Sequence, residues 1–119
     1  MKTLIIGASD KPDRYANKAM HMLEKHGHAV ILVHPNLKTI EGKPVLPSPN
    51  GVHEQVDTIT MYVNPSISDA MENALKTIKP RRVIFNPGTE NPRLARSLRA
   101  DGIEVEEACT LVLLQTGQF

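Results

Sequence analysis

The sequence predicts an α/β fold in which a mainly parallel, doubly wound sheet lies between two layers of helices. Short apolar, β-branched segments alternate with longer segments whose apolar residues recur every three to four positions. Strands separated by helices in this way are typical of βαβ units, whose right-handed crossovers cover both faces of an open sheet. The chain has 119 residues, of which 40% are hydrophobic and 23% charged. We therefore expect one globular domain over residues 1–119 with a five-stranded sheet.

The five predicted strands are short and end at turn-forming residues. They span residues 3–6, 29–33, 58–63, 82–85 and 103–105. After the first strand, residues 15–26 predict a helix with Gly27 as its C-terminal cap. The apolar residues of this helix lie on one face at helical spacing, namely Ala16, Ala19, Met20 and Leu23.

Three further segments are candidates for helices. Residues 66–79 predict a helix that begins after Pro65, ends before Pro80 and buries Ala70, Met71, Ala74, Leu75 and Ile78. Residues 91–100 predict a shorter helix with Leu94, Ala95 and Leu98 facing inward. Residues 109–114 fit either a strand or a helix, and the acidic residues Glu106 and Glu107 before them favour a helix start.

Residues 35–56 interrupt the alternation of strands and helices. Four prolines and two glycines divide this segment, so a regular crossover helix does not fit it. We expect a long loop here, with a short hairpin around Gly42 and Lys43.

The composition excludes several classes of function. A net charge of +1, two tyrosines, two phenylalanines and no tryptophan give little basis for nucleic-acid binding. The single cysteine, Cys109, excludes an internal disulfide and a cysteine-rich metal site, and the histidines show no metal-ligand spacing. Neither a signal peptide nor a membrane-spanning apolar run is evident. We therefore expect a cytoplasmic monomer or homodimer without metal, nucleic-acid or membrane partners.

The loop after the first strand is the strongest candidate for a binding site. In open α/β sheets, ligands bind beyond the carboxyl ends of the strands. Gly7 permits a close approach of the backbone, Ser9 offers a hydroxyl, and the start of the following helix favours an anion. Lys11, Arg14 and Lys18 add positive charge. The sequence therefore predicts a phosphate site at this loop.

Asparagine and proline stand next to each other after each of the next three strands. The pairs are Pro35-Asn36, Asn64-Pro65 and Asn86-Pro87. A single pair of this kind is explained by turn formation. Three pairs at the same edge of a parallel sheet favour a shared cleft.

The loop does not match the common nucleotide-binding motifs. A Walker loop requires a second glycine followed by lysine, but Pro12 stands at that glycine's position. The nicotinamide fingerprint requires glycine at positions 7, 9 and 12, where the chain has Gly7, Ser9 and Pro12. The second predicted strand also ends in Val33 and His34 rather than in an acidic residue that could bind a ribose.

The order of the motifs resembles that of the small CoA-binding proteins, single-domain relatives of the N-terminal domain of the succinyl-CoA synthetase α subunit. The family pattern Gly-x-Ser-x-x-Pro-x-Arg matches GASDKPDR, and GKPVLPSP, VDTITMYVNP, VIFNPGTEN and DGIEVEEACTLVLL follow in the family's order. The resemblance covers essentially the whole chain. It implies a Rossmann-like, three-layer αβα sandwich that binds coenzyme A or an acyl-CoA.

The resemblance also implies roles for individual residues. The CoA diphosphate would be held by Gly7, Ala8 and Ser9 and neutralised by Arg14, with Lys11 or Lys18. The adenosine part would lie between two walls, formed by His34, Pro35 and Asn36 and by Val63, Asn64 and Pro65. The pantetheine arm would pass Asn86, Pro87 and Gly88.

The chain departs from the family pattern at a few positions. Tyr15 and Ala16 stand where Pro-Ser is usual, so the start of the helix lacks a hydroxyl. His34 replaces a usual asparagine, and Asn64 stands where related synthetases carry proline. We expect these changes to affect CoA affinity and not the fold.

The sequence shows no catalytic constellation. His34 has no acidic partner fixed by the sequence, a helix-start role explains Glu90, and Cys109 lies in an apolar stretch typical of packing. The phosphorylated histidine of succinyl-CoA synthetases lies on a second domain, which we do not expect here. We therefore expect a non-catalytic binding or sensor module.

Two alternatives stay open. One is an enzyme or enzyme subunit that uses a nucleotide-like cofactor, NAD(P) or CoA, with His34, Glu90 or Cys109 at the reacting centre. The other is a Cys109 thiol that forms a mixed disulfide with CoA, which would require exposure and a lowered pKa.

Overall fold

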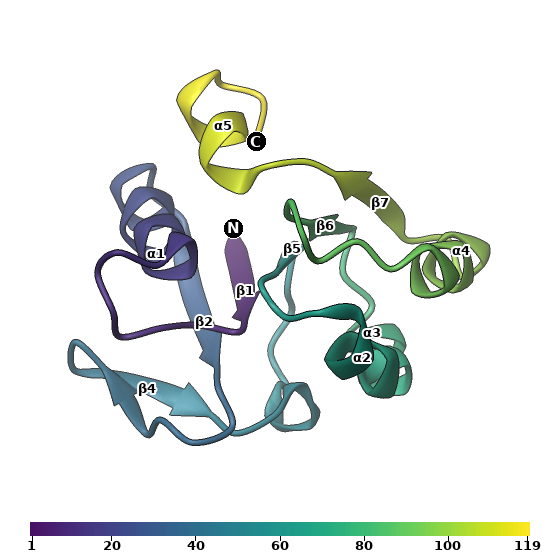
Figure 1. Cartoon of the computed structure of the whole chain (residues 1–119), viewed down its shortest axis with the longest axis horizontal. Helices are drawn as coiled ribbons and strands as arrows, with labels where there is room; N and C mark the ends of the chain where they lie inside the picture. The colour runs from purple at the N-terminus through teal and green to yellow at the C-terminus, as the bar shows by residue number, and fades with distance from the viewer.

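A computed structural model describes all residues from Met1 to Phe119 and confirms the α/β sandwich (Figure 1). The sheet has seven strands in the order β3-β4-β2-β1-β5-β6-β7. Five of them correspond to the predicted strands: β1 (Lys2–Ile6), β2 (Ala29–Val33), β5 (Thr58–Met61), β6 (Arg82–Phe85) and β7 (Glu104–Glu107). All neighbouring pairs among these five are parallel.

The two additional strands lie in the segment that we predicted as a loop. β3 (Thr39–Ile40) and β4 (Lys43–Leu46) form the predicted hairpin, whose turn residues Glu41 and Gly42 have φ values of 50° and 80°. β4 also pairs in parallel with β2 and extends the sheet. The prediction of five strands was therefore too low, because Pro44 within β4 makes this strand resemble a loop in the sequence.

Helices cover both faces of the sheet. α1 (Tyr15–Lys25) and α5 (Thr110–Gln115) pack on one face, and α2 (Pro65–Ser68), α3 (Glu72–Ile78) and α4 (Pro92–Ala100) lie on the other (Figure 1). The 3₁₀ turn η1 (Pro49–Gly51) contacts α3 on this second face. Residues 109–114, for which the sequence left strand and helix open, thus form a helix that begins at Thr110 after Cys109, whereas Glu106 and Glu107 lie in β7.

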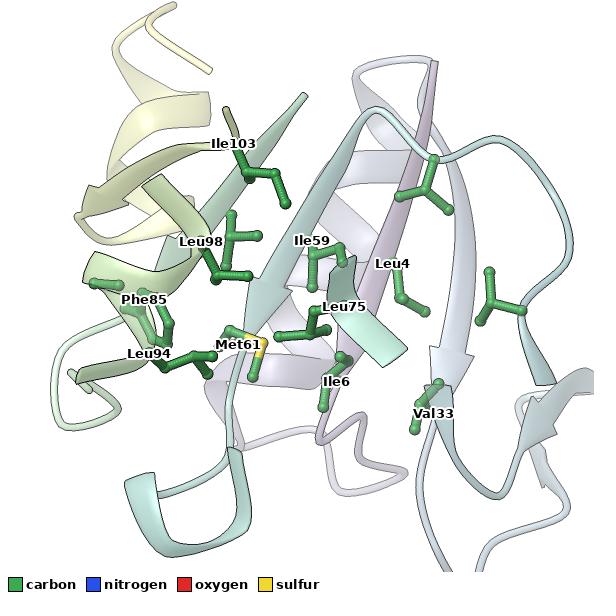
Figure 2. Packing of buried hydrophobic residues seen from close by; sticks show 14 residues of the cluster. Leu4, Ile6, Val33, Ile59, Met61, Leu75, Phe85, Leu94, Leu98 and Ile103 are labelled. Carbon is green, nitrogen blue, oxygen red and sulfur yellow. The ribbon is translucent and has the colours of Figure 1, made fainter. Parts of the chain in front are cut away.

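Each face of the sheet has its own apolar core, because successive side chains of a strand point to opposite sides. Leu4 and Ile6 belong to the larger cluster, which includes Phe85 and Leu98 and is shown in Figure 2. Ile5 belongs to the smaller cluster between the sheet, α1 and α5. As predicted, Ala16, Ala19, Met20 and Leu23 of α1 and Leu94, Ala95 and Leu98 of α4 are buried.

The predicted helix over residues 66–79 is interrupted. Between α2 and α3 the chain forms a 3₁₀ turn, η2 (Asp69–Met71), which changes the helical phase. Ala70 is consequently exposed, contrary to the prediction, whereas Ala74 and Leu75 are buried. The side-chain amide of Asn91 donates to Ser68 Oγ at 3.0 Å and to Asp69 Oδ1 at 2.8 Å, which holds the chain at this break.

A pair of substitutions distinguishes the interrupted helix from a continuous one. We expect Ala74→Lys to lower the free energy of unfolding by about 1–3 kcal/mol, because a long charged side chain is forced into the core. Ala70→Lys should change it by less than about 0.5 kcal/mol, since this position faces water. Urea denaturation of both variants provides the measurement, and equal losses would contradict the break at η2.

Candidate functional site

A cleft opens at the carboxyl ends of the strands, between the loops that follow β1 and β5. With its order β4-β2-β1-β5-β6-β7, the parallel part of the sheet reverses its direction of growth at this pair of strands, where open α/β sheets bind ligands. The cleft, here named the main cleft, has a volume of about 770 Å³. Nine predicted site residues line it: Gly7, Ala8, Ser9, Lys11, Arg14, His34, Pro35, Val63 and Asn64.

A second, smaller cavity adjoins the main cleft. This side chamber, of about 380 Å³, lies between the end of β6 and α5. It is lined by Asn86 and Pro87, both predicted, together with Tyr15, Tyr62, Cys109, Leu111, Val112 and Gln115. Tyr15 and Tyr62 line both cavities, so the two spaces adjoin at these residues.

The remaining predicted residues lie outside both cavities. Lys18 lines a separate hollow on α1 beside His21 and Glu41. The exposed residues Asn36, Pro65 and Gly88 line neither the main cleft nor the side chamber. The chain brings together no group of three or more potential metal ligands, and none of its helices has the length and apolar character needed to cross a membrane.

Gly7 lets the ends of β1 and β5 meet. Its φ is +88°, and a β carbon at this position would lie 2.8 Å from the carbonyl oxygen of Tyr62. The N–H groups of Gly7 and Ala8 both donate to the carbonyl oxygen of Val33, at 3.1 and 3.0 Å. These two N–H groups are therefore already used inside the protein, and donors for a ligand must come from later residues.

The start of α1 has the properties of an anion site. Its N-cap residue, Arg14, makes no side-chain capping bond, and the first turn contains no acidic residue. The N–H groups of Tyr15 and Ala16 have no acceptor within the chain. Cations at the positive end of a helix dipole are unfavourable unless an anion lies between them. Lys11 adds a second cation from the loop, where Asp10 also lines the cleft.

Asn17 is a site-supporting residue that the sequence analysis missed. Its side chain is only 2% exposed and donates to the carbonyl oxygen of Ser9 at 3.0 Å and to Glu41 Oε2 at 3.2 Å. Glu41 also bonds to His21, and these hydrogen bonds from Asn17 and His21 lower the pKa of its carboxyl group. The loop after β1 is thereby tied to the β3–β4 turn. A polar residue on the buried side of an amphipathic helix was the available signal.

The side chains of His34 and Asn64 stabilise turns at the edge of the main cleft. His34 Nδ1 accepts from the backbone N–H groups of Asn36 and Leu37 at 3.0 and 3.1 Å. Asn64 Oδ1 caps α2 by accepting from the N–H of Ile67 at 3.1 Å. Each side chain retains one nitrogen, Nε2 of His34 and Nδ2 of Asn64, without a partner in the chain. Both nitrogens are therefore available to a ligand.

Asn86 is the centre of a buried network between β5 and α5. Its Nδ2 donates to Thr60 Oγ1 at 2.7 Å and to the carbonyl oxygen of Met61 at 2.9 Å. Its Oδ1 accepts from the N–H of Thr110 at 2.9 Å, and the hydroxyls of Thr60 and Thr110 bond at 2.8 Å. The amide of Asn86 is thus fully engaged, and its role in the structure is to fix the start of α5.

The hydroxyl of Tyr62 is buried beside this network and makes no hydrogen bond. Burial raises the pKa of Tyr62 to about 12, so the phenol keeps its proton. Tyr62 therefore lines both cavities as a neutral residue.

The three candidate reacting groups do not meet in one cavity. His34 lines the main cleft, whereas the half-buried Cys109 lines the side chamber. Glu90 lines neither cavity, and its Oε1 accepts from the N–H of Gly88 at 2.9 Å.

Comparisons with known proteins identify the family and similar folds. A family model described as a CoA binding domain matches residues 1–115. A crystal structure of an uncharacterized protein is 44% identical, with a TM-score of 0.94 over 99% of this chain and 97% of the other. A conserved hypothetical protein from Pyrococcus furiosus is 28% identical, with a TM-score of 0.79 over 88% of this chain and 90% of the other.

A more distant solved structure shares the fold. Acetyl-coenzyme A synthetase 1 from Ca. Korarchaeum cryptofilum, solved in complex with phosphate and ADP, is 16% identical with a TM-score of 0.76. The match covers 90% of this chain but only 25% of the synthetase.

Substitution of Gly7 is expected to destabilise the protein more than substitution of a glycine with similar φ. Gly88 has φ +90° but open space around it, so Gly88→Ala should cost only the backbone strain, about 1–2 kcal/mol. Gly7→Ala adds a clash with the Tyr62 backbone and should cost about 2–5 kcal/mol in total. Chemical denaturation measures the difference, and equal costs would refute the close approach.

Loss of the Asn86 amide is expected to release α5. Asn86→Ala leaves the N–H of Thr110 and the carbonyl of Met61 without their partner, which should lower the free energy of unfolding by about 2–4 kcal/mol. Asn64→Ala, which removes an exposed cap, should cost only about 1 kcal/mol. Hydrogen exchange at Thr110 reports on α5 directly. Unchanged protection there would contradict the role of Asn86.

Proposed function

The chain belongs to the CoA-binding domain family, and we propose that it is a non-catalytic module that binds coenzyme A or an acyl-CoA in the main cleft. The observation that carries this proposal is the start of α1. Arg14, Tyr15 and Ala16 line the cleft, where Arg14 makes no capping bond and the N–H groups of Tyr15 and Ala16 have no acceptor from the chain, although Asp10 lines the same cleft. A diphosphate supplies the charge that this arrangement lacks.

In this proposal, the residues of the Gly-Ala-Ser loop have different roles in binding the diphosphate. Gly7 and Ala8 provide room for the ligand and not hydrogen-bond donors, because Val33 already accepts from both N–H groups. Ser9 Oγ accepts from the N–H of Lys11 at 3.1 Å, which leaves the hydroxyl proton of Ser9 for a phosphate oxygen. The side chains of Lys11 and Arg14 then neutralise the diphosphate.

The two sides of the main cleft suit the adenosine part of the ligand. His34 and Pro35 follow β2 on one side, and Val63 and Asn64 follow β5 on the other. The free nitrogens of His34 and Asn64 give each side one polar group. In this proposal the pantetheine arm leaves the cleft past Tyr15 and Tyr62 toward Pro87.

Binding without catalysis is supported by the separation of the reactive groups. His34, Cys109 and Glu90 lie at three different places, and the Nδ1 atom of His34 is already an acceptor for two backbone N–H groups. A general acid or base requires a partner within hydrogen-bonding reach of the reacting atom. No pair among these three provides one.

A thermal-shift screen tests the proposed ligand. At about 100 times its Kd, a ligand that binds only the folded state stabilises it by about 2.7 kcal/mol, which raises the midpoint by about 10 °C. We expect such shifts with CoA and acetyl-CoA and none with NAD, NADP or ATP at equal concentration. A shift with NADP and none with CoA would refute the proposal.

A matched pair of arginine variants tests the position of the diphosphate. Arg14→Gln should weaken CoA binding about tenfold or more, because a charge-assisted hydrogen bond is lost. Arg96→Gln removes the same charge from an exposed residue of α4 that lines neither cavity, and should leave the Kd within about twofold. Isothermal titration calorimetry measures both. Equal effects would show that only the net charge matters.

A further inference from the structure

We propose that the side chamber holds the acyl group of a CoA thioester, so that the protein binds CoA carrying a short apolar acyl group more tightly than free CoA. This inference rests on the proposed function, because the diphosphate end of the ligand is taken to lie in the main cleft. It adds a substrate class to that function.

The position of the two cavities next to each other supports the first step of this inference. Tyr15 and Tyr62 line both the main cleft and the side chamber. In this binding mode, a ligand anchored by its phosphates at α1 passes these two residues on its way to the chamber. CoA carries its thiol at the end of a long flexible arm, opposite the diphosphate, and the acyl group is attached at that thiol.

The two cavities differ in charge, as do the diphosphate and acyl ends of an acyl-CoA. The main cleft contains the charged side chains of Lys11 and Arg14, whereas no aspartate, glutamate, lysine, arginine or histidine lines the chamber. The polar groups of Asn86 are fully bonded, and the Tyr62 hydroxyl is buried and neutral. An apolar acyl group is favoured in these surroundings, and a carboxylate at its end would find no cation.

The size of the chamber limits the acyl group. An apolar cavity of about 150 Å³ is enough to hold benzene. The chamber has about 380 Å³, which accommodates the thioester and a chain of a few carbons. Longer chains would extend past Val112 and Gln115, both of which are exposed, into solvent.

Exposed apolar side chains surround the same two cavities. The chain has four exposed large hydrophobic residues, and three of them, Tyr15 (67% exposed), Val112 (50%) and Ile67 (46%), line the main cleft or the chamber. Clustered exposed apolar surface of this kind marks binding sites. An acyl-pantetheine arm that passes Tyr15 and ends beside Val112 would cover two of these three exposed apolar side chains.

The test compares CoA, acetyl-CoA, butyryl-CoA and succinyl-CoA by calorimetry on the wild-type protein. Each methylene buried in the chamber should tighten binding about fourfold. We expect butyryl-CoA to bind at least about tenfold more tightly than free CoA, and succinyl-CoA to gain nothing over free CoA. Equal affinities for all four would overturn the acyl chamber and leave the proposed CoA site intact, whereas no binding of any would overturn both.

A second experiment adds a positive charge to the chamber in order to reverse the preference between butyryl-CoA and succinyl-CoA. Val112→Lys places a cation at the chamber and should remove the advantage of butyryl-CoA while tightening succinyl-CoA about fivefold or more. Gln118→Lys adds the same charge at an exposed position just beyond α5 that does not line the chamber, and should leave the order of the four ligands unchanged. A parallel change of all four affinities in Val112→Lys would refute the inference, since the acyl group would then lie elsewhere.

Discussion

At the ends of β1 and β5, the α carbon of Gly7 lies so close to the Tyr62 carbonyl that a β carbon would come within 2.8 Å of its oxygen. This contact brings together the loops that follow β1 and β5, which then lead to helices on opposite faces of the sheet. The N–H groups of Gly7 and Ala8 then reach back to the Val33 carbonyl at the end of β2. Three neighbouring strands are thus joined at one glycine, and the walls of the main cleft keep their positions because these strand ends are fixed.

The same contact determines which groups can bind a ligand. Because the first two N–H groups of the loop are used internally, backbone donors for a ligand come from later residues, including Tyr15 and Ala16 at the positive end of α1. Asn17 holds the loop in this shape from within α1, and Glu41 links it to the hairpin. An anion site built in this way depends on the fold as a whole. In an isolated peptide, the start of α1 would be destabilised, because the N-cap residue Arg14 is positively charged and makes no side-chain capping bond.

The main strands and α1 could be predicted from the sequence because their signals are local. The apolar spacing of Ala16, Ala19, Met20 and Leu23 has one helical interpretation, and the core bears it out. The hairpin of β3 and β4 was predicted, but its addition to the sheet was not, because the pairing of β4 with β2 is not visible in the local sequence around Pro44. The break at η2 depends on Asn91, which follows it by more than twenty residues, so the periodicity of residues 66–79 could not reveal it.

In the candidate site too, local sequence patterns do not reveal contacts between distant residues. Parallel strands bring their carboxyl ends to one edge of the sheet, and for this reason nine of the predicted residues line one cleft. The position of the strand ends does not reveal whether an individual asparagine binds a ligand or stabilises a turn. Asn64 and Asn91 cap helices and Asn86 fixes α5, so the Asn-Pro and Asn-rich junctions serve the fold first. The side chamber combines residues 15, 62, 86, 87, 109, 111, 112 and 115, which no short motif connects.

Tyr15 gives the departures from the family pattern a physical meaning. A proline-serine pair at this position would add a hydroxyl at the helix start, whereas Tyr15 places an exposed aromatic ring between the main cleft and the side chamber. Lys18 Nζ lies 5.5 Å from the centre of this ring, so Lys18 contacts a residue of both cavities although it lines neither of them. Under the proposed function, the exchange would remove a hydroxyl from the phosphate end of the site and add apolar surface toward the chamber. Binding energy would then shift from the phosphate end of the ligand toward its acyl end, which is the direction expected of a site that discriminates among thioesters and not merely among nucleotides.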